Sequence, residues 1–220
     1  MKNNFWRTLN LPNRLTLLRL ILVLPFIILC TIVTILWMYR FENNDAYIYG
    51  IRIVMPLAIL VFVAAMITDF FDGYIARKRN IVTSFGKLWD PIADKFITTT
   101  ALIFLAAWNM IPVWLVLLFV LRDLVVDGCR SVLSKHSVDI AANIFGKIKT
   151  MLLSIGLVIT LIVFTVYAPY NASYSSFYST VNAYWFTYVI NLPILIAGAF
   201  NIIAAIPYIK NALLVIKQRG

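Results

Sequence analysis

The sequence contains long runs of apolar residues in which no charged side chain occurs. The runs Leu20–Tyr39, Phe96–Leu121 and Thr150–Ile209 contain no Asp, Glu, Lys or Arg, and a shorter apolar run, Ile53–Thr68, precedes an acidic segment. A helix needs about 20 apolar residues to cross the hydrocarbon core of a bilayer. Because these runs are too long and too uniformly apolar for barrel strands, the pattern predicts membrane-spanning helices.

The pattern divides the chain into six predicted spans. We place them at residues 15–38, 51–77, 85–107, 112–135, 144–167 and 185–209. A short amphipathic segment at residues 2–11 is expected to lie on the membrane surface. Since neither an internal repeat nor a Pro/Gly/Ser-rich linker interrupts the pattern, the predicted fold class is all-α integral membrane, with one membrane domain over residues 1–220.

Basic residues occur at every second connection between the predicted spans. They lie in the N-terminal segment, at 77–87, in 122–149 and in the C-terminal tail, whereas 109–112 and 168–184 carry no charge. Lys and Arg accumulate on the cytoplasmic side of membrane proteins. The distribution therefore predicts six spans with both termini in the cytoplasm. We also expect a multi-pass protein of the plasma membrane.

Composition agrees with this class and removes one alternative. The chain has 220 residues, of which 62% are hydrophobic, a mean hydropathy of +0.90 and a formal net charge of +10. Because basic residues flank membrane spans, this charge does not indicate nucleic acid as a partner, and none is expected. Cys30 and Cys129 lack metal-ligand spacing and are interpreted as packing residues.

Four of the nine acidic residues lie near the facing ends of two consecutive predicted spans. Asp69 and Asp72 are three residues apart, and Asp90 and Asp94 are four apart, so each pair shares one face of its helix. A helical hairpin would bring both pairs to the same membrane depth. We therefore expect four carboxylates to converge on one small volume.

Carboxylates this close together repel one another unless a cation is bound between them. A set of oxygen ligands favours Mg²⁺, Mn²⁺ or Ca²⁺, and two ions can clamp both sides of a phosphoryl displacement. The alternative is a structural network in which the aspartates pair with Arg and Lys. Since ionisable groups at membrane depth mark function by default, the metal site is favoured.

The acidic segment resembles the signature of a known family. The residues are Asp69-x2-Asp72-Gly73-x2-Ala76-Arg77-x8-Gly86-x3-Asp90-x3-Asp94. This spacing is similar to that of the CDP-alcohol phosphatidyltransferases. The resemblance implies a six-helix membrane enzyme, usually a homodimer, that transfers the phosphatidyl group of CDP-diacylglycerol to an alcohol and releases CMP.

The resemblance also implies roles for individual residues. The expected ligands of two Mg²⁺ or Mn²⁺ ions are Asp69, Asp72, Asp90 and Asp94. Asp94 is also the expected general base, which accepts a proton as the alcohol attacks phosphorus. The expected contacts to CDP-diacylglycerol are Asn13, Thr16, Gly73, Arg77 and Thr83. Asn13 is compatible with a second role, as the N-cap of the first span.

Three other segments are similar to the branch of this family that uses sn-glycerol 3-phosphate as acceptor. They are residues 10–16 with Arg19, residues 121–130 and residues 145–150. The expected acceptor-phosphate pocket consists of Arg122, Arg130, Lys147 and Lys149. The alternative for each of these cations is topological, because Lys and Arg flank the cytoplasmic ends of any membrane protein.

The expected reaction yields phosphatidylglycerophosphate and CMP, in the synthesis of anionic membrane lipids. One alternative is a sister enzyme whose acceptor is inositol phosphate, serine or phosphatidylglycerol. Another is a cation transporter whose carboxylates line a pathway through the membrane. The transporter is disfavoured because the acids cluster at one side and the later spans are nearly free of charge.

Overall fold

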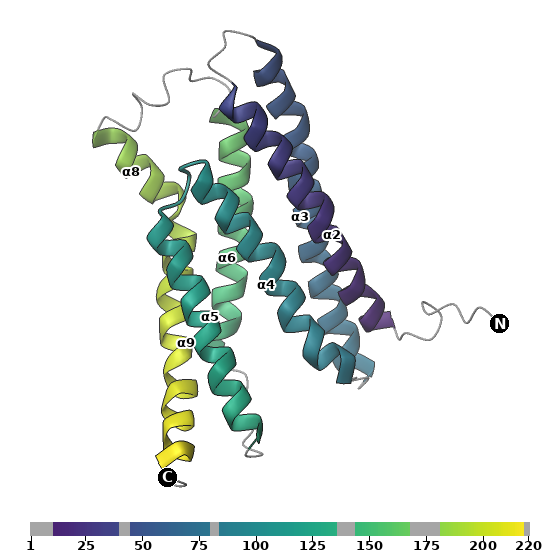
Figure 1. Ribbon diagram of the computed structural model, residues 1–220, viewed down its shortest axis with the longest axis vertical. Helices are drawn as coiled ribbons and strands as arrows, with labels where there is room; N and C mark the ends of the chain where they lie inside the picture. Colours follow the sequence, from purple (N-terminus) through teal and green to yellow (C-terminus); the bar gives the residue numbers. More distant parts are fainter. Residues whose placement is uncertain (1–10, 40–44, 80–83, 136–143, 168–180, 218–220) are drawn as a thin grey trace, which may run out of the picture. The chain divides into compact units, whose positions relative to one another are not determined.

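The computed structural model describes residues 11–39, 45–79, 84–135, 144–167 and 181–217, and every regular element in these ranges is an α-helix (Figure 1). The helices are α2 (Leu11–Met38), α3 (Asp45–Arg79), α4 (Ser84–Ala107), α5 (Val113–Lys135), α6 (Ile144–Tyr167), α8 (Val181–Ile190) and α9 (Leu192–Lys217). The prediction of an all-helical fold is confirmed for this part of the chain.

The predicted helix limits hold better for the first five helices than for the last. Helices α2 and α3 begin earlier than predicted, and the helix predicted at 185–209 is wrong in both limits. It is divided at Asn191 into α8 and α9, and α9 continues to Lys217. Pro193 is the second residue of α9, where the missing N–H of proline removes no intrahelical hydrogen bond, so it is compatible with a new helix start there. Apart from Leu11, the amphipathic segment predicted at 2–11 lies outside the described residues.

Four of the described helices are long and apolar enough to cross a membrane. These spans are Asn13–Met38, Ala46–Phe71, Ile144–Val166 and Leu192–Lys217. The two remaining long helices, α4 and α5, carry several charged residues each, including the predicted site residues. The described helices are therefore those of a multi-pass membrane protein.

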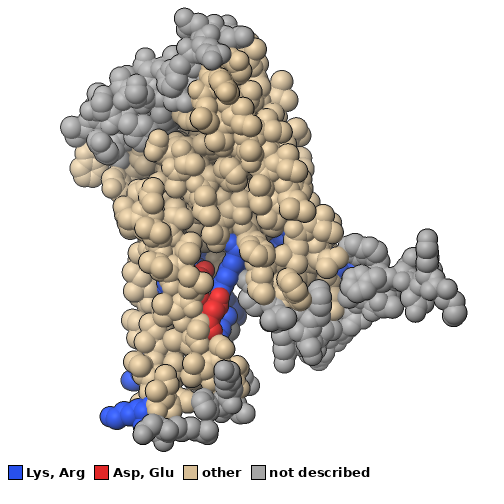
Figure 2. All heavy atoms as spheres, viewed as in Figure 1, with Lys and Arg blue, Asp and Glu red and all other residues tan. Residues whose placement is uncertain are grey.

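Large apolar side chains are exposed on the outer faces of the helices. Leu24 of α2 is 63% exposed, Leu60 of α3 is 66% exposed and Ile206 of α9 is 57% exposed. In the view of Figure 2, Lys, Arg, Asp and Glu atoms cover only a small part of the described surface. So much exposed apolar area indicates faces that contact lipid rather than water.

The chain forms two compact units. The first contains residues Met1–Phe104 and Leu161–Ser179, and the second contains Leu105–Thr160 and Thr180–Gly220. In the first unit α2 packs along α3, with the rings of Phe26 and Phe62 5.6 Å apart between centroids. Apolar contacts of this kind hold the two helices that carry Arg19 and Asp69.

In the second unit α5 packs against α9. Small buried residues on α9 allow the close approach, and they include Ala197, Gly198, Ala204 and Ala205. Val126 of α5 packs with Ala205 and Tyr208 of α9 in one buried cluster, which Cys129 borders. This contact places the charged stretch of α5 beside α9.

A polar contact around Asn191 joins three parts of the second unit. The Asn191 side-chain amide donates to the carbonyl oxygens of Met110 (2.7 Å) and Thr187 (2.9 Å). The hydroxyl of Thr160 on α6 donates to the Asn191 side-chain oxygen at 3.1 Å. Because buried polar groups are costly without partners, these bonds stabilise the break between α8 and α9.

Gly156 provides a test of the crossing of α6 and α9. A Cβ atom at this position would lie 2.5 Å from Cγ1 of Ile194 and 3.2 Å from its backbone nitrogen. We expect Gly156→Ala to lower the free energy of unfolding by about 1–3 kcal/mol, since an overpacked contact forces the backbone to shift. Thermal unfolding of the purified protein in detergent measures this loss.

Gly128→Ala is the matched control, because a Cβ atom there has nothing within 4 Å. Alanine is a better helix former than glycine by about 1 kcal/mol, so this variant should be as stable as the parent protein or slightly more stable. Equal unfolding temperatures for Gly156→Ala and the parent protein would contradict the tight crossing.

Candidate active site

The four signature aspartates lie on helices that leave the same short connection, residues 80–83. Asp69 and Asp72 are near the C-terminal end of α3, and Asp90 and Asp94 are in the first half of α4. Both helices extend from this connection towards the same end of the first unit, so the chain runs in opposite directions along them (Figure 1). At a rise of about 1.5 Å per residue, Asp69 and Asp94 both lie about 15 Å along their helices from it, and the inner pair about 10 Å. These positions on the helices are consistent with the expectation that the two aspartate pairs lie at the same membrane depth.

The side chains of this site are described only in part. Asp69 and Asp94 are described, and both are of intermediate exposure. Residues Asp72, Gly73, Arg77 and Asp90 lie on α3 and α4, but their side chains are outside the described set, and Thr83 lies outside the described residues altogether.

The described side chains alone cannot hold a metal ion in the expected way. Among them, no group of three or more His, Cys, Asp and Glu side chains is close enough to form a metal site. That set lacks two of the four predicted ligands, Asp72 and Asp90. Convergence of the four carboxylates therefore remains a prediction from the sequence.

Asp69 is paired with an arginine from a different helix. Nη1 of Arg19 on α2 lies 2.6 Å from Oδ1 of Asp69, and the Arg19 side chain is fully buried, whereas that of Asp69 is 44% exposed. A buried guanidinium requires a counter-charge, which Asp69 supplies. The carboxylate has a second oxygen on a partly exposed group, so this ion pair and a metal contact are chemically compatible.

Two of the predicted donor contacts lie on the same helix as Arg19. Asn13 is 6% exposed and Thr16 is 1% exposed, so α2 buries three polar residues at intervals of three. Helix α2 already includes Leu11 and Pro12, which places Asn13 inside the first turn. The interpretation of Asn13 as the N-cap is therefore wrong, because an N-cap residue precedes the first helical turn.

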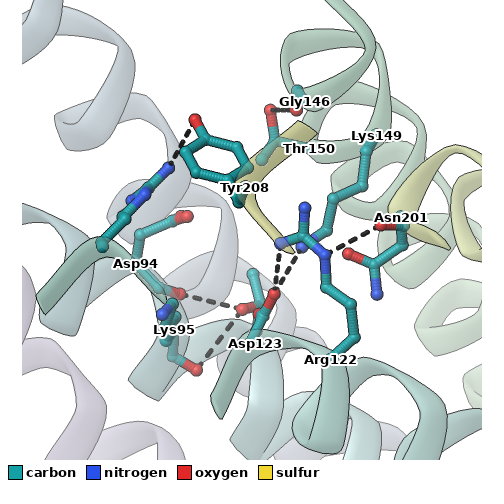
Figure 3. A network of polar contacts seen from close by, with 11 residues as sticks. Asp94, Lys95, Arg122, Asp123, Gly146, Lys149, Thr150, Asn201 and Tyr208 are labelled. Carbon is teal, nitrogen blue, oxygen red and sulfur yellow. Dashed lines mark hydrogen bonds and ion pairs between the residues drawn. The ribbon is translucent and has the colours of Figure 1, made fainter. Parts of the chain in front are cut away.

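Two of the four predicted acceptor cations meet at one carboxylate in the second unit. Oδ1 of Asp123 lies 2.9 Å from Nη1 of Arg122 and 3.1 Å from Nζ of Lys149 (Figure 3). Lys149 of α6 is buried, and its ammonium group lies 5.7 Å from the ring centroid of Phe119. Asp123 thus joins α5 to α6 and offsets one of the two positive charges.

Helix α9 contacts both arginines of α5. Nε of Arg122 donates to the backbone carbonyl of Asn201 at 2.8 Å (Figure 3). Nη2 of Arg130 donates to the Tyr208 hydroxyl at 3.3 Å. Cζ of Arg130 also lies 5.0 Å from the centroid of the Tyr208 ring. The fourth predicted cation, Lys147, is exposed near the start of α6.

Sequence reasoning identified the cations but missed what holds them. Nothing in the sequence pairs Arg19 with Asp69, although an arginine beside a charge-free run needs an acidic partner. Asn201 and Tyr208 lie within the apolar run Thr150–Ile209, where they are polar residues without a motif. Their roles depend on which faces of α5 and α9 meet.

Comparisons with known proteins agree with the signature. The family model described as CDP-alcohol phosphatidyltransferase matches residues 9–190. Three bacterial relatives share the name CDP-diacylglycerol–glycerol-3-phosphate 3-phosphatidyltransferase. The chain is 40% identical to that of Bacillus subtilis over 141 residues, which cover 64% of this chain and 70% of the relative.

The two other relatives align over more of the chain. The Mycoplasma genitalium protein is 35% identical over 198 residues, covering 90% of this chain and 81% of the relative. The Mycoplasma pneumoniae protein is 33% identical over 195 residues, covering 88% and 83%. Because the family model spans most of the sequence and the signature aspartates fall inside it, the chain belongs to the CDP-alcohol phosphatidyltransferase family.

Proposed function

We propose that this protein is a phosphatidylglycerophosphate synthase, which transfers the phosphatidyl group of CDP-diacylglycerol to sn-glycerol 3-phosphate and releases CMP. The aspartate signature on α3 and α4 carries the proposal, and the names of the three relatives support the choice of acceptor. Because the chain belongs to a transferase family, we no longer favour the alternative that it is a cation transporter.

The proposal includes a placement in the membrane. Helices α4 and α5 complete six spans, both termini lie in the cytoplasm, and the active site faces the cytoplasmic side of the plasma membrane. The positions of Lys and Arg support this orientation. The protein is proposed to act as a single membrane domain and as a homodimer, surrounded by membrane lipids.

The candidate metal ligands fit a divalent cation by their chemistry. Asp69 and Asp94 are only partly buried, and they belong to a set of four carboxylates that offers only oxygen atoms. Such a set suits Mg²⁺ or Mn²⁺, and Asp69, Asp72, Asp90 and Asp94 would hold two ions. When bound, the ions would stabilise negative charge on the diphosphate as CMP leaves.

The protein side chains position the reactants and transfer one proton. A hydroxyl oxygen of glycerol 3-phosphate forms a bond to the phosphatidyl phosphorus, while the bond from that phosphorus to the CMP oxygen breaks. Asp94 accepts the proton that the hydroxyl loses. It contributes to catalysis through its position near the attacking oxygen.

Residues from three segments hold CDP-diacylglycerol in this proposal. Gly73 allows close approach of the nucleotide because it has no side chain, and Arg77 binds the diphosphate. Asn13 and Thr16 of α2, both buried, and Thr83 complete the donor contacts.

The acceptor set carries an excess of positive charge. Arg122, Arg130, Lys147 and Lys149 supply four positive charges, and Asp123 and Asp127 of α5 supply two negative charges, which leaves two positive charges (4 − 2). Glycerol 3-phosphate is a dianion, so this excess favours its binding. Serine, a zwitterion, would gain far less from the same set.

The choice of acceptor can be measured directly. Purified protein is incubated with CDP-diacylglycerol, radiolabelled in the cytidine, and with one acceptor at a time. We expect rapid CMP release with glycerol 3-phosphate and a much slower release with serine, inositol phosphate or phosphatidylglycerol. Faster release with any of the other three acceptors would assign the protein to a sister activity.

Asp94→Asn separates proton transfer from substrate binding. We expect kcat to fall by about a hundredfold or more, because a positioned general base contributes about 10²–10⁴ in rate. Binding of CDP-diacylglycerol should change by only a few-fold, and Asp45→Asn, an acid at the other end of α3, should retain activity. Equal loss of binding and turnover would make Asp94 mainly a metal ligand.

Arg130→Ala tests the acceptor pocket. A charge-assisted hydrogen bond contributes about 1.5–3 kcal/mol, so the KM for glycerol 3-phosphate should rise about tenfold or more. The KM for CDP-diacylglycerol should change much less. An unchanged acceptor KM would exclude Arg130 from the pocket.

A further inference from the structure

We propose that Tyr208 of α9 is a positioning residue for Arg130 and thereby sets how tightly the acceptor phosphate is bound. The inference rests on the proposed role of Arg130 in binding that phosphate. Tyr208 lies beyond residue 190, where the match to the family model ends.

Two different contacts fix the guanidinium of Arg130 on Tyr208. Cζ of Arg130 lies 5.0 Å from the ring centroid, within the range of a cation–π contact. Nη2 also donates to the Tyr208 hydroxyl at 3.3 Å. Both contacts are made to the same Tyr208 side chain, so together they restrain the position of the guanidinium.

Tyr208 is itself held in place by the helix interface. The residue is only 6% exposed and packs with Ala205 of its own helix and Val126 of α5, beside Cys129. Val126, Cys129 and Arg130 share one face of α5, at spacings of three and four residues. Tyr208 is therefore fixed by the contact between α5 and α9. Through it, the guanidinium of Arg130 is held in place although Arg130 itself is exposed.

The other arginine of α5 is held by the same helix in a different way. Arg122 donates to the backbone carbonyl of Asn201, seven residues before Tyr208 on α9. Arg122 and Arg130 are eight residues apart on α5, which is about two helical turns. The two contacts therefore lie along the same side of α5, which faces α9. Because Arg122 is held by backbone, a substitution at Tyr208 should affect Arg130 alone.

This arrangement leaves Arg130 able to bind an anion. A guanidinium has five N–H donors, and the Tyr208 hydroxyl accepts from one nitrogen only. A long side chain normally loses rotamer freedom when it binds a phosphate, and one that is already ordered has less to lose. Tyr208 should therefore lower the KM for the acceptor without contributing to the chemical step.

The first test compares three variants of two tyrosines. We expect Tyr208→Leu to raise the KM for glycerol 3-phosphate about fivefold, with kcat and the KM for CDP-diacylglycerol within about twofold of the parent protein. Tyr208→Phe keeps the ring and should recover most of the acceptor affinity. Tyr188→Leu makes the same change at an exposed tyrosine of α8 and should leave all three constants unchanged.

The second test is a double-mutant cycle with Arg130→Ala. If Tyr208 acts through Arg130, Tyr208→Leu should have no further effect on the acceptor KM once Arg130 is replaced. An equal effect in both backgrounds would overturn the positioning role. Should Tyr208→Leu fail to fold, Tyr208→Met, which keeps more of the side-chain length, takes its place in both tests.

The outcomes separate this inference from the proposed function. If Arg130→Ala leaves the acceptor KM unchanged, the acceptor pocket itself is wrong. If Arg130→Ala raises that KM but Tyr208→Leu and Tyr208→Met do not, the pocket stands and the positioning role of Tyr208 is refuted.

Discussion

Charged groups inside a membrane protein must find partners, because neither lipid nor the apolar interior can solvate them, and this constraint organises the polar residues of the chain. The fully buried Arg19 of α2 lies against Asp69 of α3, and buried Lys149 shares Asp123 with Arg122. The Arg19–Asp69 and Lys149–Asp123 pairs each join two different helices, so they also specify which faces meet. Apolar side chains pack around these ion pairs.

The two compact units differ in the polar groups that they hold. The first contains the aspartate signature and the buried polar residues of α2, to which we assign donor and metal binding. The second contains the cations of α5 and α6, to which we assign the acceptor phosphate. It also contains the bonds of Asn191, which satisfy carbonyls at a helix break and need no ligand to explain them. Under this proposal, burial of polar groups serves substrate and metal binding at α2, whereas at Asn191 it stabilises a helix break.

The sequence predicted the helices and the signature well, because both are local patterns. Charge-free runs mark α2, α3 and α6, and the spacing of the four aspartates survives in the helix positions of α3 and α4. The break at Asn191 was missed, since Pro193 lies in an apolar run that otherwise reads as one span. The contacts of Arg19 with Asp69 and of Arg130 with Tyr208 could not be predicted, because uniformly apolar helices do not reveal how they are rotated against one another.

The central claim is that Asp69, Asp72, Asp90 and Asp94 act together through bound divalent cations. The most direct measurement is CMP release from CDP-diacylglycerol and glycerol 3-phosphate by purified protein that has been thoroughly treated with a chelator. We expect turnover to fall to background and to return when Mg²⁺ or Mn²⁺ is added in excess. Full activity in the continued presence of the chelator would contradict the claim.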